Sequence, residues 1–355
     1  MTSPRVDVVI AVHSATRPIA RAVGSVLGHT RADVRVIVVA HNIDREVIRA
    51  NLGSWADDER VLLLDLRDGI PSPSGPMNHG FDAATGDFVA LLGSDDEFEP
   101  GAIDSWLALQ RAADADVVIA QIRHEGGGKE LSPPARPRRS IGLHPVKDRL
   151  AYRSAPLGLV SRARFGDLRF PAGLASGEDL PYVTALWFSG ARIAFARSGP
   201  GYLVHADAAD RVTSGPRTIA ADFAFLDHII DAPRFAGLDK AERGAIAIKI
   251  IRMHVFDALV NRAQQDPWPE GERAALAGVV RRILAWGGPV DAWLSLIDHK
   301  VLDGILDEVT PVDELMDLLR RRWNYRSADV VLTRNPVMAL HRQGPLRTYV
   351  GGYFV

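Results

Sequence analysis

The chain has 355 residues, of which 47% are hydrophobic and 24% charged, so it can bury a large core and is neither disordered nor collagen-like. A formal charge of −2 provides no global field that would recruit nucleic acid or anionic lipid. Cysteine is absent, which excludes disulfides, thiolate zinc sites and a cysteine nucleophile. The length favours one large domain accompanied by a smaller one.

The first residues contain no basic stretch that leads into a long apolar run, so the sequence predicts no secretory signal. No run approaches the ~18 uncharged apolar residues that a transmembrane helix needs. We therefore expect a cytoplasmic protein. A place at the inner face of the membrane stays open, through a membrane-associated substrate.

Strand-like and helix-like segments alternate in the N-terminal third of the chain. Strands are expected at 6–12, 35–40, 61–66, 88–92 and 117–121. Helices are expected between them at 18–27, 45–52 and 76–84. This alternation predicts right-handed βαβ units and a mostly parallel sheet, so the expected fold class is α/β. Ligands of such sheets bind beyond the carboxyl ends of the strands.

The second half of the chain has a different character. Residues 125–145 are rich in Gly, Pro and Arg and are expected to form a long loop. From about residue 220, apolar residues recur at helical spacing, with helices expected at 272–286, 290–306 and 311–323. We therefore divide the chain into an α/β domain over 1–220 and a mostly helical region over 221–355.

The strongest local signal is the acidic cluster Asp95-Asp96-Glu97, which follows the apolar strand at 88–92 almost directly. Neighbouring carboxylates raise each other's pKa unless a cation or hydrogen-bond donors compensate. Oxygen ligands without cysteine suit Mg²⁺ or Mn²⁺. The alternative is a solvated turn that caps a helix beginning near Pro100. The position at the carboxyl end of a strand favours the metal site.

These segments together resemble family 2 glycosyltransferases, which are inverting enzymes of the GT-A fold. Residues 8–28 are similar to that family's opening strand, turn and helix, and residues 74–96 to its Gly-rich helix, strand and acidic metal motif. Gly177-Glu178-Asp179 and the His-containing segment at 202–214 follow in the family's order. The resemblance implies a nucleotide-sugar-binding and catalytic domain over 1–220, with a Mn²⁺ or Mg²⁺ cofactor.

The resemblance also implies a role for each matching acidic residue. Asp95 is expected to contact the ribose of a nucleotide diphosphate sugar. Asp96 is expected to bind the metal, with His205 completing the metal site, whereas Glu97 is expected to support the turn or a water ligand. Asp179 is the candidate general base, because an inverting transfer needs one carboxylate to take the proton of the acceptor hydroxyl. Glu178 is the second candidate.

Structural alternatives accompany these roles. The acidic pair Glu178-Asp179 precedes an apolar helix, so its alternative role is to cap the helix N-terminus. The alternative for His205 is a histidine that serves only the fold.

The nucleotide pocket departs from the family pattern. An acidic pair usually follows the second strand, where this chain has Ala40-His41-Asn42. His41 or Asn42 is expected to hydrogen-bond the base instead, with a UDP-sugar as the expected donor although uridine specificity is not fixed. The remaining candidates for the donor site are Asp68, Asn78, Arg211 and Ser214. Arg211 is expected either to supply charge-assisted hydrogen bonds to the diphosphate or to lie, with Ser214, on a solvated loop.

The acceptor is expected, by analogy alone, to be a cell-wall, capsule or teichoic-type glycan or polymer, or a lipid-linked glycan. The basic C-terminal stretch, with 320–322, Arg342 and Arg347, is either a packed tail or a surface for a polyanionic acceptor or a membrane. No nucleic-acid partner is expected, and the sequence does not indicate an oligomeric state. Two other functions stay open: a non-catalytic nucleotide-binding scaffold, and another metal-dependent phosphoryl or nucleotidyl transferase.

Overall fold

The structure, a computed structural model, describes residues 5–207, 217–263 and 268–353. The chain divides into two compact units. The first consists of Met1–Glu130, Arg139–Leu143 and Ser154–Gly215, and the second of Leu131–Arg138, His144–Arg153 and Pro216–Val355. Two segments upstream of residue 220 thus pack with the C-terminal unit, which the sequence-based division did not include. Within that unit the side chain of Arg136 pairs with Asp148, which joins the two segments.

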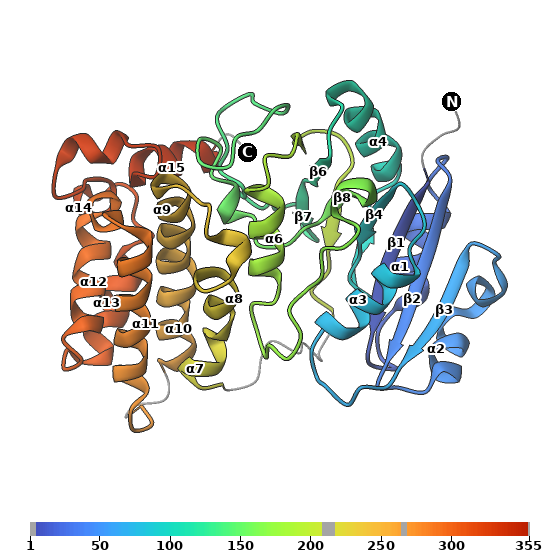
Figure 1. Ribbon diagram of the computed structural model, residues 1–355, viewed down its shortest axis with the longest axis horizontal. Helices are drawn as coiled ribbons and strands as arrows, with labels where there is room; N and C mark the ends of the chain where they lie inside the picture. Colours follow the sequence, from blue (N-terminus) through green and yellow to red (C-terminus); the bar gives the residue numbers. More distant parts are fainter. Residues whose placement is uncertain (1–4, 208–216, 264–267, 354–355) are drawn as a thin grey trace. The chain divides into compact units, whose positions relative to one another are not determined.

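The first unit is built on a seven-stranded sheet with the strand order β3-β2-β1-β4-β8-β6-β9 (Figure 1). Its strands are β1 (Val6–Val12), β2 (Val34–His41), β3 (Val61–Leu66), β4 (Phe88–Leu91), β6 (Val117–Ala120), β8 (Gly158–Ser161) and β9 (Ile193–Ala196). The strand pairs are parallel except for the two that β8 makes. The predicted α/β class and its mostly parallel sheet are therefore confirmed.

Helices connect these strands, and the first three lie within two residues of their predicted ranges. They are α1 (Ile19–Leu27), α2 (Arg45–Leu52), α3 (Ser74–Ala83) and α4 (Ala102–Ala113), followed later by α5 (Arg162–Phe165) and α6 (Asp179–Trp187). The side chain of Asp44 accepts a hydrogen bond from the Glu46 N–H at 2.9 Å, which caps the start of α2. The core between helices and sheet is formed by apolar strand residues and by the fully buried Trp106 of α4.

The strand order reverses at β1. From β1 the chain moves outward through β2 and β3, and β4 then pairs with the opposite edge of β1. In open α/β sheets, ligands bind at such a switch point, beyond the carboxyl ends of the strands. The residues that follow Val12 and Leu91 are therefore the first place to look for a site.

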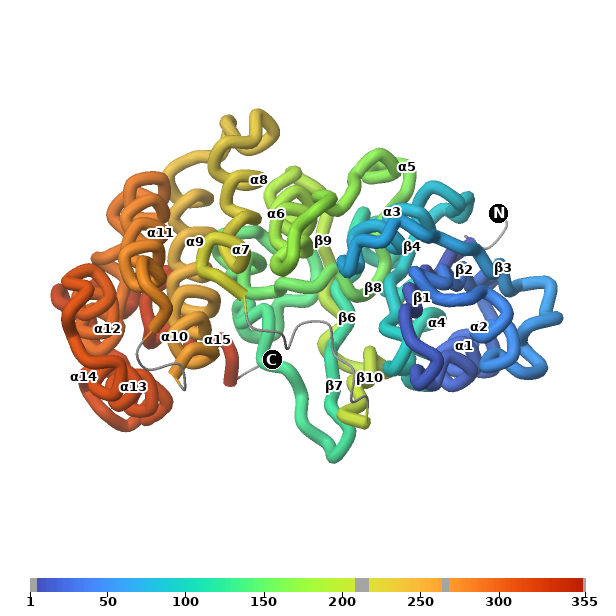
Figure 2. The backbone as a smooth tube through the Cα atoms, turned by 90° about the horizontal axis from the view of Figure 1, so that it is seen from below, coloured from blue at the N-terminus to red at the C-terminus, as the bar shows by residue number. Residues whose placement is uncertain are grey.

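A second sheet of three strands has the order β5-β10-β7. Its strands are β5 (Glu97–Phe98), β7 (Ile122–His124) and β10 (Tyr202–Val204). Figure 2 shows β7 and β10 side by side, and in this register Tyr202 pairs with Phe98 on one side and Ile122 on the other. The small sheet thus brings the end of β10 next to the acidic cluster after β4.

The second unit is helical (Figure 1). Its helices are α7 (Ile219–Asp222), α8 (Asp227–Ile230), α9 (Lys240–Lys249), α10 (Phe256–Arg262), α11 (Glu272–Gly287), α12 (Leu296–Leu306), α13 (Val312–Arg321), α14 (Ala328–Val331) and α15 (Pro345–Tyr353). The single helix expected over 290–306 is interrupted, because Ser295 caps α12 by accepting from the Asp298 N–H at 3.1 Å. Of the helices described, none is long and apolar enough to cross a membrane.

Candidate functional site

Two arginines from the β1 side hold the acidic cluster that follows β4. Asp95 forms an ion pair with Arg17, which lies in the turn between β1 and α1 and is only 7% exposed. Arg21 of α1 donates to the backbone carbonyl of Asp95 and pairs with the carboxylate of Asp207 at 2.7 Å. These contacts join the two loops at the switch point. Sequence reasoning missed both arginines, although their position just after β1 was a usable signal.

Asp96 is half-buried, and both of its carboxylate oxygens accept hydrogen bonds. Oδ2 accepts from the Tyr202 hydroxyl at 2.6 Å, and Oδ1 accepts from the His205 N–H at 3.0 Å. Burial raises the pKa of Asp96, against the opposing effect of these two hydrogen bonds. Burial disfavours the ionised form of such a carboxylate, and a bound cation would stabilise that form.

Gly93 makes room for this arrangement. Its N–H donates to the Tyr202 hydroxyl at 2.9 Å. A Cβ at this position would lie 2.7 Å from Oδ2 of Asp96, closer than real Cβ atoms come to a neighbour. Any larger residue would therefore displace the Asp96 carboxylate.

The imidazole of His205 lies between two carboxylates. Nε2 is 2.6 Å from Oε2 of Glu97, and Nδ1 is 3.1 Å from Oε2 of Glu125. The register of the three-stranded sheet produces this meeting, because Glu97 begins β5, Glu125 follows β7 and His205 follows β10. The structure thus brings the two predicted metal ligands, Asp96 and His205, into contact, and adds Glu125, which sequence reasoning missed because it lies in the predicted loop.

The chemistry of this donor set fits a hard divalent cation. Carboxylate oxygens suit Mg²⁺ and Mn²⁺, and imidazole is a further ligand of Mn²⁺ and related metals. Within 5–207, 217–263 and 268–353, no group of three or more His, Cys, Asp or Glu side chains encloses a site for an ion. Mg²⁺ is usually held by only one or two carboxylates, with water and substrate phosphates as further ligands. Asp96 with one neighbour is thus a sufficient contribution from the protein.

The three candidates for the base end of the donor site meet at the ends of β2 and β3. His41 Nε2 is 2.8 Å from Oδ1 of Asp68, and the Asn42 amide donates to the same oxygen at 3.2 Å. Burial acts to raise the pKa of Asp68, but hydrogen bonds from the Ile70 N–H, His41 and Asn42 lower it below its usual value. These residues therefore form one connected polar group with an ionised carboxylate.

Asn78 is placed differently. Its amide donates to the Phe170 carbonyl at 2.9 Å, and its side-chain oxygen accepts from the Phe170 N–H at 2.9 Å. The ring of Phe170 stacks on Tyr182 of α6, with the centroids 4.2 Å apart. The contacts of Asn78 therefore hold the segment that leads to α6.

Glu178 and Asp179 lie at the start of α6, both half-buried. Asp179 is the first residue of the helix, and Glu178 at the N-cap position has helical backbone angles and makes no side-chain cap hydrogen bond. Capping by Glu178 therefore does not explain this residue. Arg211 and Ser214 lie outside the described residues.

The arginines at the end of α13 form ion pairs within their own unit. The pairs are Arg320–Asp317 at 2.7 Å, Arg321–Asp329 at 2.7 Å and Arg322–Asp298 at 2.6 Å. Each of these three arginines is therefore paired with a carboxylate of its own unit.

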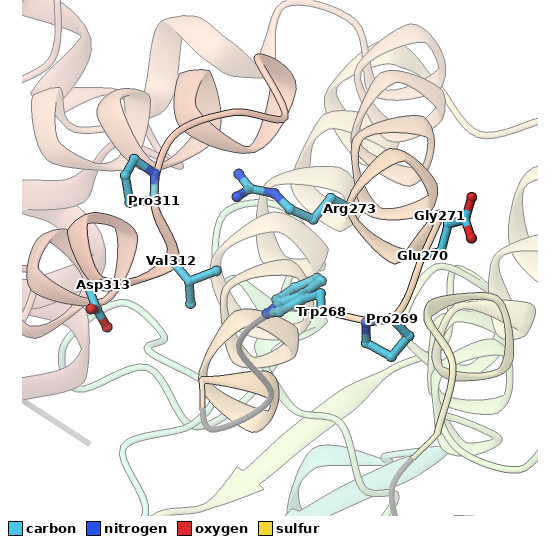
Figure 3. Close-up of a pocket in the computed structure, with 8 residues that line it drawn as sticks. All are labelled: Trp268, Pro269, Glu270, Gly271, Arg273, Pro311, Val312 and Asp313. Carbon is cyan, nitrogen blue, oxygen red and sulfur yellow. The ribbon is translucent and has the colours of Figure 1, made fainter.

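A separate hollow of the C-terminal unit lies near the starts of α11 and α13 (Figure 3). It is lined by Trp268, Pro269, Glu270, Gly271, Arg273, Pro311, Val312 and Asp313. The Arg273 guanidinium donates to the Thr310 carbonyl at 2.7 Å, and this hydrogen bond joins two segments of the unit. The hollow contains none of the residues predicted to carry chemistry.

Comparison with known proteins identifies the N-terminal region. The family model for Glycosyl transferase family 2 matches residues 7–165. Over these residues, which are less than half of the chain, the protein is similar to family 2 glycosyltransferases. The resemblance seen in the sequence motifs is thereby confirmed, and the enzyme class is glycosyltransferase.

Two relatives and one solved structure describe how far this similarity extends. The succinoglycan biosynthesis protein ExoO of Rhizobium meliloti is 27% identical over 293 residues, which are 75% of this chain and 82% of that protein. The uncharacterized glycosyltransferase alr2836 of Nostoc sp. is 32% identical over 99 residues, which cover 27% of this chain and only 30% of that protein. The crystal structure of S. aureus TarS residues 1–349 in complex with UDP-GlcNAc has a TM-score of 0.73 at 16% identity, covering 89% of this chain and 91% of that one.

At this level of identity the likeness to TarS shows the fold. The predicted GT-A fold with a helical C-terminal region is confirmed, since 89% of the chain is covered.

Proposed function

We propose that the chain transfers a sugar from a nucleotide diphosphate sugar to an acceptor hydroxyl, with inversion and with a divalent cation. The observation that carries the proposal is the meeting of Asp95, Asp96 and His205 at the switch point, where the β1 and β4 loops are joined by Arg17. The family 2 domain supports sugar transfer as the reaction.

On the donor side, Asp95 is proposed to accept hydrogen bonds from the ribose hydroxyls. Its ion pair with Arg17 fixes the carboxylate in place before the donor arrives. Asp96 and His205 are proposed to hold Mn²⁺ or Mg²⁺, which when bound stabilises the negative charge of the departing diphosphate. Arg21 adds positive charge at the same edge.

On the acceptor side, Asp179 is proposed to take the proton of the attacking hydroxyl. The new bond forms between that oxygen and the anomeric carbon while the bond to the diphosphate breaks on the opposite face, which inverts the configuration. A residue at the start of a helix held by the Phe170–Tyr182 stack is well fixed for this task. Glu178 is the second candidate base.

His41, Asn42 and Asp68 are proposed to contact the nucleoside, and Arg211 and Ser214 the diphosphate. Binding of UDP-GlcNAc by TarS supports a UDP-sugar as the donor. The role of ExoO in succinoglycan biosynthesis supports a polysaccharide, or a lipid-linked or polymeric glycan, as the acceptor. We propose a cytoplasmic enzyme, for which a place at the inner face of the membrane stays open.

A screen of nucleotide sugars with Mn²⁺, followed by chromatography of the released nucleotide, tests this proposal. We expect release of a nucleoside diphosphate, increased by a suitable acceptor. Binding of the donor without turnover under every condition would instead favour the scaffold function. Release of a sugar 1-phosphate or of a nucleoside monophosphate would favour a phosphoryl or nucleotidyl transferase.

A further inference from the structure

A pocket in the C-terminal unit is lined largely by arginine and lysine. It has a volume of about 450 Å³, and its lining residues are Arg136, Pro137, Lys147, Arg149, Arg342, Arg347, Val350 and Gly351. Five of these described residues are basic and none is acidic. The segments 131–138 and 144–153 provide one part of the lining, and residues of and before α15 provide the rest. The fold therefore collects positive charge from stretches that are far apart in the sequence.

Arg149 distinguishes this pocket from a basic surface. Its side chain is 3% exposed, and Nη1 donates to the Pro134 carbonyl at 2.7 Å. Its Nε is buried without a hydrogen-bond partner in the part of the chain that the structure describes. Burial, and then the like charges of Arg347 and Arg252, lower the pKa of Arg149 to about 10. A buried guanidinium with an unused donor costs free energy unless an anion compensates it.

The carboxylate of Asp148 lies near the pocket, but both of its oxygens already accept hydrogen bonds from Arg136. It therefore does not neutralise the other basic residues. Arg136 donates to Asp148 from Nε at 2.7 Å and from Nη2 at 2.6 Å. Among described residues, Lys147, Arg342 and Arg347 have no carboxylate within salt-bridge distance. The pocket thus keeps a net positive charge that a ligand can neutralise.

We propose that this pocket binds a phosphate group, either as the free ion or as part of a phosphate ester. The planar fork of arginine matches phosphate oxygens with parallel charge-assisted hydrogen bonds. Arg149 is reached only by a group that enters the pocket, whereas a flat anionic membrane would reach the exposed Arg342 and Arg347. The site is therefore shaped for a discrete phosphate group.

Gly351 of α15 supports this assignment. A Cβ at this position would lie 2.4 Å from the Pro134 carbonyl oxygen and 3.1 Å from Nη1 of Arg149. Glycine therefore lets α15 approach the buried arginine, and α15 carries Arg347 with it.

Calorimetric titration of the full chain at constant ionic strength tests the proposal, with inorganic phosphate and diethyl phosphate as separate probes. We expect saturable binding to the wild type. Arg149→Met should weaken it about 10- to 100-fold, the effect of losing charge-assisted hydrogen bonds. The double variant Arg342→Met/Arg347→Met, which changes only exposed side chains, should weaken it at least about tenfold and does not threaten the fold.

Arg320→Met is the matched control, because it removes an arginine that is 71% exposed and lies outside the pocket. Its affinity for both probes should equal that of the wild type. Binding of both probes would assign the site to a phosphodiester-bearing ligand, and binding of inorganic phosphate alone to the free ion or a monoester.

Three results would overturn the proposal. One is the absence of saturable binding to the wild type, and another is an equal loss of affinity in Arg320→Met. The third is binding to phosphatidylglycerol vesicles with no response to either small probe, which would make the basic residues a membrane surface. The measurement does not depend on sugar transfer, so its failure would leave the proposed function untouched.

Discussion

Two aspartates, one in each unit, have different neighbours and opposite pKa shifts. Asp298 of α12 is 4% exposed, and its carboxylate lies 2.6 Å from Arg322 Nε and 3.5 Å from Arg252 Nε. Burial acts to raise its pKa, but the two arginines together lower it. Asp96 of the N-terminal unit accepts hydrogen bonds from neutral groups, and burial raises its pKa.

The difference separates a structural carboxylate from one prepared for a ligand. The protein itself neutralises Asp298, so this aspartate stabilises the helical unit. No arginine or lysine pairs with Asp96 among the described residues, and the neighbouring carboxylate of Asp95 acts to raise its pKa further. We propose that a cation bound with the substrate neutralises Asp96.

The largest expected effect comes from the proposed general base. Asp179→Asn should reduce the rate of transfer about 10²- to 10⁴-fold, because the acceptor proton has no base to receive it. Donor affinity should stay within about twofold of the wild type, since a base on the acceptor side makes no donor contact. A turnover assay combined with donor titration measures both quantities.

Asp104→Asn is the matched control for this variant. Asp104 also lies in the first turn of a helix, where its carboxylate accepts the N–H groups of Arg31 and Ala32 at 3.1 Å. Its replacement should lower the melting temperature without changing the rate of transfer. Full activity of a folded Asp179→Asn protein would remove the assignment and direct attention to Glu178.

Replacing the structural aspartate Asp298 should lower the free energy of unfolding. Asp298→Asn leaves the buried guanidinium of Arg252 and that of Arg322 uncompensated, and loss of one partner of a buried ion pair costs about 3–5 kcal/mol. Urea denaturation measures this. Asp303→Asn on the same helix removes a pair with Arg334 that is exposed on both sides, so a change below about 1 kcal/mol is expected.

This stabilisation also has a predictable pH dependence. The pKa of Asp298 is lowered in the folded protein, so its stabilisation is complete well above the ordinary value of 3.8 and is lost as the pH falls through the folded pKa. The difference in unfolding free energy between wild type and Asp298→Asn should therefore be constant near neutral pH and shrink in acid. A difference that grows in acid would contradict this sign.

A smaller effect is expected at Gly93. Gly93→Ala should shift the Asp96 carboxylate away from the Tyr202 hydroxyl, at a cost of about 1–3 kcal/mol in stability or in nucleotide affinity. Gly128→Ala places its Cβ in open space and serves as the control. Melting curves and UDP titration should distinguish the two variants, and equal behaviour would show that the space at Gly93 is not needed.

The smallest effect concerns which nucleobase of the donor the protein prefers. If Asn42 donates a hydrogen bond to the nucleoside, Asn42→Ala should weaken UDP binding by about 0.5–1.5 kcal/mol. Titration with UDP, GDP, ADP and TDP measures the preference. A strong preference for UDP that survives replacement of both His41 and Asn42 would show that the base is read elsewhere.

Much of the fold follows from local sequence patterns. The largely apolar runs at 6–12 and 61–66 correspond residue for residue to β1 and β3. β1 lies inside the parallel sheet and is buried along most of its length, which calls for a nearly continuous apolar segment. The break before α12 escaped the prediction, since the spacing of apolar residues continues across it. Only the capping pair of Ser295 and Asp298 reveals where the helix begins.

The site was predictable where its residues are consecutive or follow a strand. Asp95 and Asp96 fall in that class. Glu125, Arg17 and Tyr202 depend on the register of the small sheet and on the pairing of loops, which no local pattern encodes. The basic pocket is a similar case, because the contribution of Arg136 and Arg149 depends on where their segments pack.

The proposed function depends above all on Asp96, which we propose binds a divalent cation together with the donor diphosphate. Calorimetric titration of UDP into wild type and Asp96→Asn, each with and without Mn²⁺, tests it most directly. We expect Mn²⁺ to tighten UDP binding to the wild type and to have little effect on folded Asp96→Asn, while Asp104→Asn behaves as the wild type. An equal Mn²⁺-dependent gain in affinity in Asp96→Asn would contradict the claim.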